Sequence, residues 1–264
     1  MIAVPTDLSS RSLSVLPVAR RLGRVTAVSV FGVPAMMLED KEEARRVVDR
    51  HRSSRRSEVL DALSQRGCDD AEAVAIQGVP VESLAEWIDR RRPEAIVMSS
   101  HGQTGFVRLL LGSVASRLIR VSSRPVWIIH SDRAISALLA DHPRILVAID
   151  PAVDQSEALF AAIVPWAIAL DAKVDLVAVA GPLGSEADDA ERTLERARSS
   201  LPEAVRGAIE VRLGAPRAQI IDCAGSHDLV AVGSHTRGAL GRLLLGSVSA
   251  GVARLLPAVA VIPL

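Results

Sequence analysis

The chain has 264 residues, of which 49% are hydrophobic and 23% charged, so its composition is that of a globular protein and excludes a disordered one. Its 31 basic and 31 acidic residues give a net charge of zero, which removes the electrostatic basis for binding nucleic acid or an anionic membrane. Aromatic residues make up only 2%, with no Tyr, so few rings are present to stack on single-stranded bases.

Short apolar runs rich in Val, Ile and Ala alternate with longer segments of helical periodicity, a pattern typical of crossover units around a parallel sheet. The first half of the chain predicts strands near residues 1–5, 25–31, 72–77, 95–99 and 125–130. Helices are predicted there near 9–22, 39–66, 80–91 and 112–122. The second half predicts helices between strands near 144–149, 174–180, 207–213, 228–233 and 258–262. We therefore expect five strands in each half.

The helix predicted at 39–66 carries Arg, Glu and Asp side chains of mixed sign. A surface for nucleic acid or for an acidic partner is one interpretation, but mixed charges at helical spacing favour a solvated helix face. Residues 131–142, which join the halves, include Ile135, Leu138 and Leu139 and predict a short helix. So short a connection favours two halves packed as a fixed pseudo-dimer.

Nothing in the sequence predicts export or membrane insertion. The apolar start is interrupted by Pro5 and Asp7 and lacks the basic opening of a signal peptide. The apolar run 158–170 is shorter than the roughly 20 residues that cross a bilayer. Cys68 and Cys223 stand alone, without a paired motif, which favours a reducing, cytoplasmic setting.

The two halves are copies of one unit. Residues 108–114, Arg-Leu-Leu-Leu-Gly-Ser-Val, recur unchanged at 242–248, 134 positions later. Gly78-Val79-Pro80 likewise matches Gly214-Ala215-Pro216, and the apolar runs before these motifs correspond as well. A repeat this long indicates two domains and not a solenoid of small units. We predict them at residues 1–135 and 142–264.

The loop after the fourth strand of each half is predicted to hold a phosphate. Ligands of an open parallel sheet bind beyond the carboxyl ends of the strands. Ser113 and Ser247 begin the helices that follow, and a helix start offers unpaired N–H groups and the positive end of the macrodipole. Gly112 and Gly246 let the backbone come close to a ligand.

These residues resemble a known nucleotide signature. Gly102, with nine residues between it and Gly112-Ser113, is similar to the G-x-x-G-x9-G-[S/T] motif of the universal stress proteins. The likeness covers both halves and includes the V-P-T-D-x-S opening at residues 4–9. It implies an α/β fold of two tandem Rossmann-like domains, similar to adenine nucleotide alpha hydrolases and packed as a pseudo-dimer. Each domain would have a five-stranded parallel sheet, in the order 3-2-1-4-5, flanked by helices. The last strands, at 126–130 and 258–262, would pair with each other.

The resemblance also implies an adenine nucleotide, ATP with or without Mg2+, as the ligand of each half. Its residues come in matched pairs. The adenine edge would be hydrogen-bonded by Asp7 and Asp150, and the base would meet the backbone of Val30 and Val179. The loop beside the nucleotide would contain Gly78 and Gly214.

The remaining implied contacts follow the ribose and the phosphates. The ribose and the first phosphates would lie along the backbone from Ser99 to Gly102 and from Gly233 to Thr236. The phosphate tail would be held by Gly112, Ser113 and Val114 in one half and by Gly246, Ser247 and Val248 in the other.

Each half departs from the signature at one glycine. Ser99 stands where the first Gly belongs, and Thr236 stands where the second belongs. A side chain costs about 1 kcal/mol or more where the backbone needs a positive φ or a close approach. Because Thr is β-branched, we predict that the first half binds more tightly.

Several of these residues also have a plainer interpretation. Asp7 and Asp150 are equally suited to cap the helices that follow them. Gly78 and Gly214 are also the residues that a turn requires.

The matched histidines and arginines of the loop are also open to two interpretations. His101 and His235 have no partner carboxylate or nucleophile at a recognisable spacing, which favours a loop-fixing role over catalysis. Arg108 and Arg242 either reach a phosphate or only cover the helix end.

The sequence predicts no dedicated catalytic site and no metal site. It has no G-x-x-x-x-G-K-[ST] loop, no G-x-G-x-x-G after the first strands and no His spacing typical of zinc. Gln103 and Arg237 occupy the loop where phosphoryl transfer needs a Lys and a metal-binding carboxylate. Any ATP hydrolysis is expected to be slow, and an enzyme that transfers adenylate is the least favoured alternative.

The function predicted is that of a cytoplasmic stress sensor or regulator that binds an adenine nucleotide. Its expected partners are the nucleotide and either a second copy of the chain or a regulatory protein, with no nucleic acid and no membrane insertion. The main alternative is a module of the same fold that has lost the nucleotide and serves dimerisation or protein interaction.

Overall fold

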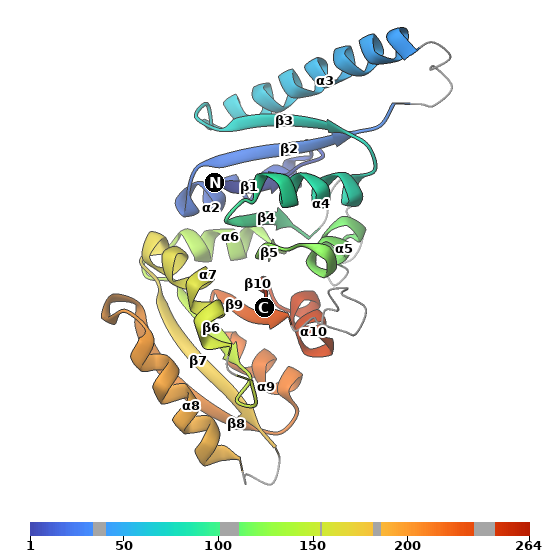
Figure 1. Ribbon diagram of the computed structural model, residues 1–264. Helices are drawn as coiled ribbons and strands as arrows, with labels where there is room; N and C mark the ends of the chain where they lie inside the picture. The colour runs from blue at the N-terminus through green and yellow to red at the C-terminus, as the bar shows by residue number, and fades with distance from the viewer. Residues whose placement is uncertain (34–40, 101–110, 154, 182–185, 235–245) are drawn as a thin grey trace.

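A computed structural model describes residues 1–33, 41–100, 111–153, 155–181, 186–234 and 246–264. The chain forms one sheet of ten strands with helices on both faces (Figure 1). The strand order is β3-β2-β1-β4-β5-β10-β9-β6-β7-β8, so each half has the predicted order 3-2-1-4-5. The fold prediction is confirmed, with the addition that the two five-stranded sheets are continuous.

The ten strands begin and end within one residue of their predicted bounds. Those of the first half are β1 Ile2–Pro5, β2 Val25–Phe31, β3 Glu72–Gln77, β4 Ala95–Ser99 and β5 Val126–Ile129. Those of the second half are β6 Arg144–Ile149, β7 Lys173–Ala180, β8 Arg206–Leu213, β9 Leu229–Ser234 and β10 Ala258–Pro263. The prediction was this close because most of these strands are buried on both faces and read as continuous apolar runs.

The helices connect parallel strands and cover the sheet. The first half and the linker contain α1 Ser10–Leu13, α2 Leu16–Leu22, α3 Lys41–Ser64, α4 Pro80–Arg91, α5 Ser113–Val121 and α6 Asp132–Leu139. The second half contains α7 Ser156–Leu170, α8 Ala187–Ser200, α9 Pro216–Cys223 and α10 Ser247–Leu255, with short 3-10 turns η2 Glu203–Val205 and η3 Ala224–Ser226.

The prediction of one helix over 9–22 was wrong, because α1 and α2 are separate. Pro17, near the start of α2, has no N–H to donate to the carbonyl of Leu13. The first helix closes instead with a tighter bond from the amide of Ser14 to the carbonyl of Arg11, 3.2 Å long. The predicted linker helix, in contrast, is present as α6, with Ser131 as its N-cap.

The halves are joined through their last strands. β5 and β10 pair antiparallel over four residues, from Val126 opposite Val261 to Ile129 opposite Ala258, as the resemblance implied. Trp127 of β5 lies opposite Ala260 and packs edge-on against Trp166 of α7, with ring centroids 5.1 Å apart. Two apolar cores, one on each face of the sheet, extend across this junction.

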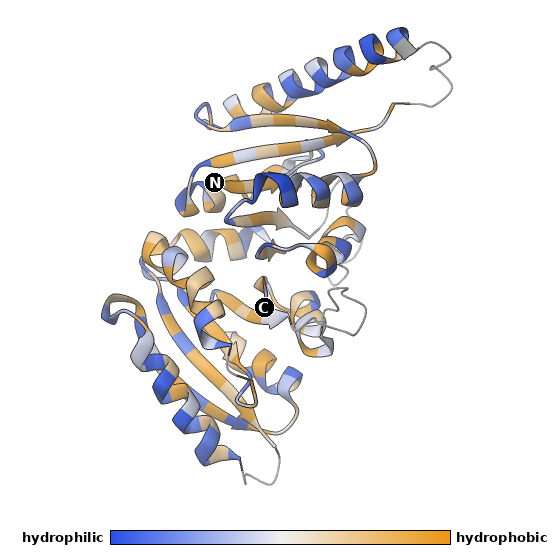
Figure 2. Cartoon of the chain, viewed as in Figure 1, coloured by the Kyte–Doolittle hydropathy of each residue, from blue (hydrophilic) through white to orange (hydrophobic). Residues whose placement is uncertain are grey.

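Charged side chains gather on the outer helices, where Figure 2 shows α3 and α8 mostly blue against the orange strands. Along α3, Arg46, Arg52 and Arg55 pair with acidic residues three or four positions away. Pairing of opposite charges along one exposed helix supports the solvated-face interpretation. Among the helices that the structure describes, none is long and apolar enough to cross a membrane.

An ionic cluster around a buried carboxylate lies at the amino ends of the strands in the second half, with Asp175 and His227 buried and Arg144 half exposed. The carboxylate of Asp175 on β7 accepts hydrogen bonds from Arg144 at 2.6 and 3.1 Å and from His227 Nε2 at 3.0 Å. Its other oxygen accepts the amide of Ala208 at 2.6 Å. Burial alone would raise the pKa of Asp175, but the bonds from His227, Ala208 and Arg144 outweigh it and lower the pKa to about 2.

Acid is therefore expected to weaken the fold through Asp175. Its pKa falls from the ordinary value of 3.8 to about 2 on folding, so its contribution is present above pH 3.8 and is lost as the pH falls toward 2. This linkage amounts to about 2 kcal/mol. Urea unfolding of the wild type and of Asp175→Asn across pH 2–7 should show a stability difference that shrinks over that window. A difference that stays constant with pH would contradict it.

Candidate functional site

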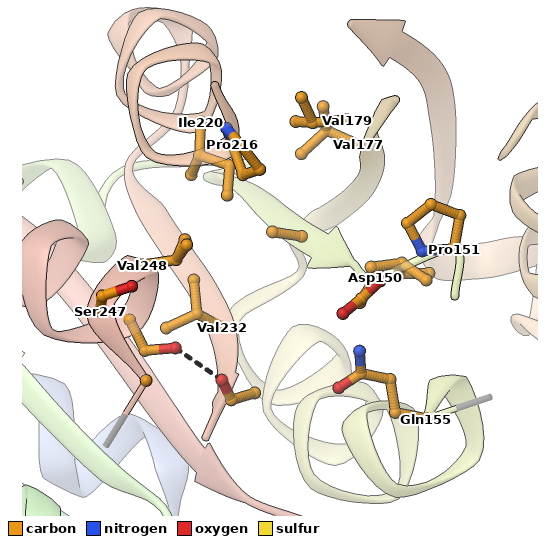
Figure 3. Close-up of a pocket in the computed structure, with 15 residues that line it drawn as sticks. Asp150, Pro151, Gln155, Val177, Val179, Pro216, Ile220, Val232, Ser247 and Val248 are labelled. Carbon is orange, nitrogen blue, oxygen red and sulfur yellow. Dashed lines mark hydrogen bonds between the residues drawn. The ribbon is translucent and has the colours of Figure 1, made fainter. Parts of the chain in front are cut away.

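The second half has a pocket of about 260 Å³ beyond the carboxyl ends of β6, β7 and β9 (Figure 3). One wall is apolar and consists of Val177, Val179, Pro216 and Ile220. The polar residues of the wall are Asp150, Gln155, Ser247 and Ser249. In Figure 3, Asp150 and Gln155 lie on one side of the hollow and Ser247 on the other.

The first half has a pocket of about 170 Å³ in the corresponding place. Its wall includes Val28 and Val30 of β2, Leu84 of α4 and Met98 of β4. Its polar groups come from Thr6, Asp7, Ser12 and Ser99. The duplicated sequence therefore forms two hollows at equivalent edges of the sheet, and the one in the first half is smaller.

Glycine, and not serine, caps the helices that start at the two pockets. Gly112 precedes α5 and Gly246 precedes α10, both with nearly the same backbone angles and without a capping side chain. Their carbonyls accept the amides of Ser116 at 2.8 Å and Ala250 at 2.9 Å, which starts each helix. Since no side chain caps the first amides, these helix starts have N–H groups available to an anion.

Asp7 and Asp150 both lie in pocket walls and both form local turns. Asp7 Oδ1 accepts the amide of Ser9 at 3.0 Å, and Asp150 Oδ1 accepts the amide of Ala152 at 3.0 Å. Ser9 itself caps α1 and the N-cap of α7 is Gln155, so the interpretation of both aspartates as helix caps was wrong. The turns hold each carboxylate beside its pocket.

Gly78 and Gly214 have φ angles of 141° and 120°, which favour glycine. Neither lies in a pocket wall, whereas the prolines two residues later, Pro80 and Pro216, do. Their geometry supports the interpretation of these glycines as turn residues, because the turn places the proline and the helix after it in the pocket wall.

The other predicted residues divide into three groups. Those in a pocket wall are Val30, Ser99, Val114, Val179, Gly233, Gly246, Ser247 and Val248. Gly112 and Ser113 belong to the helix start outside the walls. Residues that lie outside the described part of the chain are His101, Gly102, Gln103, Arg108, His235, Thr236, Arg237 and Arg242.

The strain expected at Ser99 is absent, because its φ angle is not positive. The close-approach argument applies instead to its counterpart Gly233, where a Cβ would lie 2.7 Å from Gln155 Oε1 and 2.3 Å from a Leu264 methyl. The Gly233 carbonyl accepts Ser249 Oγ at 2.7 Å, which is the dashed line in Figure 3. The second-half pocket is the larger of the two, but Thr236 lies outside the described residues, so the affinity ranking of the halves stays a prediction.

Among the wall residues that sequence reasoning missed are Gln155 and the apolar helix residues Ile220 and Leu84. The two helix residues belong to apolar periodic segments, so nothing in the sequence separates them from core positions. Gln155 follows a loop that has no counterpart in the signature, and its arrival at the pocket depends on how α7 is placed against β9.

Comparisons with known proteins assign both halves to one family. The model of the Universal stress protein family matches residues 1–130 and 142–263. A universal stress protein of Mycobacterium tuberculosis is 34% identical over 193 residues, which cover 66% of this chain and 62% of that protein. The chain thus spans less than two thirds of the length of this relative.

Solved structures give the same fold. A universal stress protein of Archaeoglobus fulgidus superposes with a TM-score of 0.74 at 23% identity, over 99% of this chain and 97% of the other. A second neighbour, from Pseudomonas aeruginosa, has a TM-score of 0.65 at 15% identity and covers 99% of this chain and 92% of its own. At these identities the likeness concerns the architecture, including the tandem arrangement.

Proposed function

Because this chain belongs to the universal stress protein family, we propose that it binds an adenine nucleotide, ATP with or without Mg2+, in the pockets of its two halves. The observation that carries the proposal is the matched pair of pockets, each with a glycine-capped helix start at one end. An apolar slot beside unpaired helix amides suits a base at one end and phosphates at the other.

The order of residues along the pocket of the second half supports one orientation of the nucleotide. The base would lie against Val177, Val179 and Ile220, and the phosphates would meet the amides at Ser247. Asp150 lies across the hollow from Ser247, beside Gln155, and we assign it to the ribose and not to the adenine edge that the resemblance implied. Mg2+ would enter with the phosphates, whose oxygens it prefers.

We assign the chain the role of a cytoplasmic sensor or regulator, with hydrolysis at most slow. The alternative, a ligand-free interaction module, gains no support from the last strands. β5 and β10 pair with each other within the chain, so these edges are used and a further copy or a regulatory partner would need another surface.

Filling one pocket at a time tests the proposal. Val30 and Val179 occupy matched, half-buried positions at the ends of β2 and β7, and Trp in their place would fill the adjoining pocket. Isothermal titration of the wild type with ATP, alone and with Mg2+, should detect binding at up to two sites. Val30→Trp should leave only the second-half site and Val179→Trp only the first. Opposite to the ranking from the sequence, we expect the second-half site to bind several-fold to about tenfold more tightly, since each added hydrogen bond contributes about 1 kcal/mol.

The double variant Val30→Trp/Val179→Trp serves as the control and should bind nothing while unfolding at a temperature close to that of the wild type. Wild-type protein that takes up neither ATP nor AMP at millimolar concentration would refute the nucleotide proposal. Wild-type stoichiometry and affinity retained in both single variants would show that the nucleotide binds elsewhere.

A further inference from the structure

One polar side chain in the second pocket is buried without a use in the fold. Gln155 is only 7% exposed, and its Oε1 has no hydrogen-bond partner among the residues that the structure describes. A buried amide oxygen without a donor costs free energy that an apolar side chain of the same shape would not. Such a group in a pocket wall is typical of a residue retained for a ligand.

The Gln155 side chain makes no hydrogen bond to the fold among the residues that the structure describes. It is the N-cap residue of α7, yet its side chain makes no capping bond and only its backbone carbonyl joins the helix, through the amide of Leu159 at 3.1 Å. In Figure 3 the amide nitrogen is turned toward Asp150. The oxygen lies on the side of Gly233, where a Cβ would come within 2.7 Å of it.

The first-half pocket is different. There the wall carries Ser12, whose hydroxyl contacts Thr6 Oγ1 at 2.8 Å and donates to the Ser9 carbonyl at 3.0 Å. That hydroxyl is satisfied within the protein. Among the described wall residues of the two pockets, a buried acceptor without a donor is found in the second half, at Gln155 Oε1.

We infer that Gln155 is a specificity-determining residue of the second-half site, and that its amide oxygen accepts a hydrogen bond from a ribose hydroxyl of the bound nucleotide. The inference rests on the proposed function. Gln155 and Asp150 are neighbours in the pocket wall on the side opposite Ser247, and each contributes an acceptor oxygen to that side. A ribose cis-diol carries two O–H donors, which matches this pair, and a deoxyribose lacks one of them.

The test uses the full-length Val30→Trp protein, in which only the second-half site is open. ATP, 2′-deoxy-ATP and 3′-deoxy-ATP are titrated into this protein and into its Gln155→Met version, and both are melted without ligand. Gln155→Met should weaken the binding of ATP about tenfold and change the affinity for one of the deoxy analogues by less than twofold. It should also raise the Tm of the ligand-free protein by about 2–4 °C. Gln65→Met, the same change on an exposed residue at the end of the α3 segment, should alter neither quantity.

Replacing a residue that serves the ligand should weaken ATP binding and raise the Tm, whereas replacing a residue that serves the fold should lower the Tm. A lower Tm in Gln155→Met, or equal weakening of ATP and both deoxy analogues, would overturn the inference while leaving nucleotide binding intact. Failure of the Val30→Trp protein and of the wild type to bind any of the three nucleotides would overturn the proposed function, and this inference with it.

Discussion

Replacing Asp175 by Ala is expected to lower the free energy of unfolding by about 3–5 kcal/mol at pH 7, the range for breaking a buried ionic cluster by removing one partner. The side chain is 9% exposed and joins β6, β7, β8 and the turn before β9 through Arg144, Ala208 and His227. Without it, the buried His227 ring and the Ala208 amide lose their acceptor at once. Urea unfolding followed by circular dichroism measures the loss.

Two variants define the cause of this loss. Asp175→Asn keeps the shape and part of the bonding, so it should cost less than Asp175→Ala. Thr26 has the matched place on β2, where its hydroxyl donates a long bond, 3.2 Å, to Glu72. Thr26→Ala should therefore cost no more than about 1 kcal/mol. Equal losses at positions 26 and 175 would show that strand packing, and not the ionic cluster, is responsible.

Local pattern accounts for what the sequence predicted well. The strands were bounded closely because a strand in a covered parallel sheet is apolar on both faces, as Ile145 to Ile149 illustrates. The duplication then located both pockets, because equivalent loops of equivalent sheets meet at equivalent edges. The signature thus placed Asp7, Val30, Asp150 and Val179 in pocket walls.

What the sequence did not reveal depends on contacts between distant segments. Asp175, Arg144 and His227 are far apart in the chain, and the cluster is invisible until β6, β7 and η3 are assembled. Gln155 reaches its pocket only because α7 begins opposite Gly233. The strain expected at Ser99 was assumed from the motif, whereas the backbone there is ordinary strand. Pro17 indicated a break in the predicted helix 9–22, but the helical periodicity of that segment favoured one continuous helix.

Replacing Trp127 by Ala is expected to have an equally large effect, about 3–5 kcal/mol, the range for truncating a buried aromatic side chain. Trp127 is fully buried, on β5 of the first half, and contacts Trp166 of α7 in the second. The cavity would therefore lie at the junction of the halves, where β5 and β10 pair. We expect both halves to lose stability together in urea unfolding, because they share the sheet and its two cores.

Comparison variants separate the aromatic contact from the volume that the ring fills. Trp127→Phe removes an indole N–H that has no hydrogen-bond partner within the described ranges, and retains most of the apolar area, so it should cost far less than Trp127→Ala. A double-mutant cycle with Trp166→Phe should give a coupling of about 0.5–1.5 kcal/mol for the edge-to-face pair. Trp87, on α4 and away from the junction, supplies the control: Trp87→Ala should destabilise the protein but show no coupling to Trp127. If Trp127→Ala instead produced two separate unfolding transitions, the joined sheet would not make the halves one cooperative unit, and the nucleotide sites would have to be treated as belonging to two independent domains.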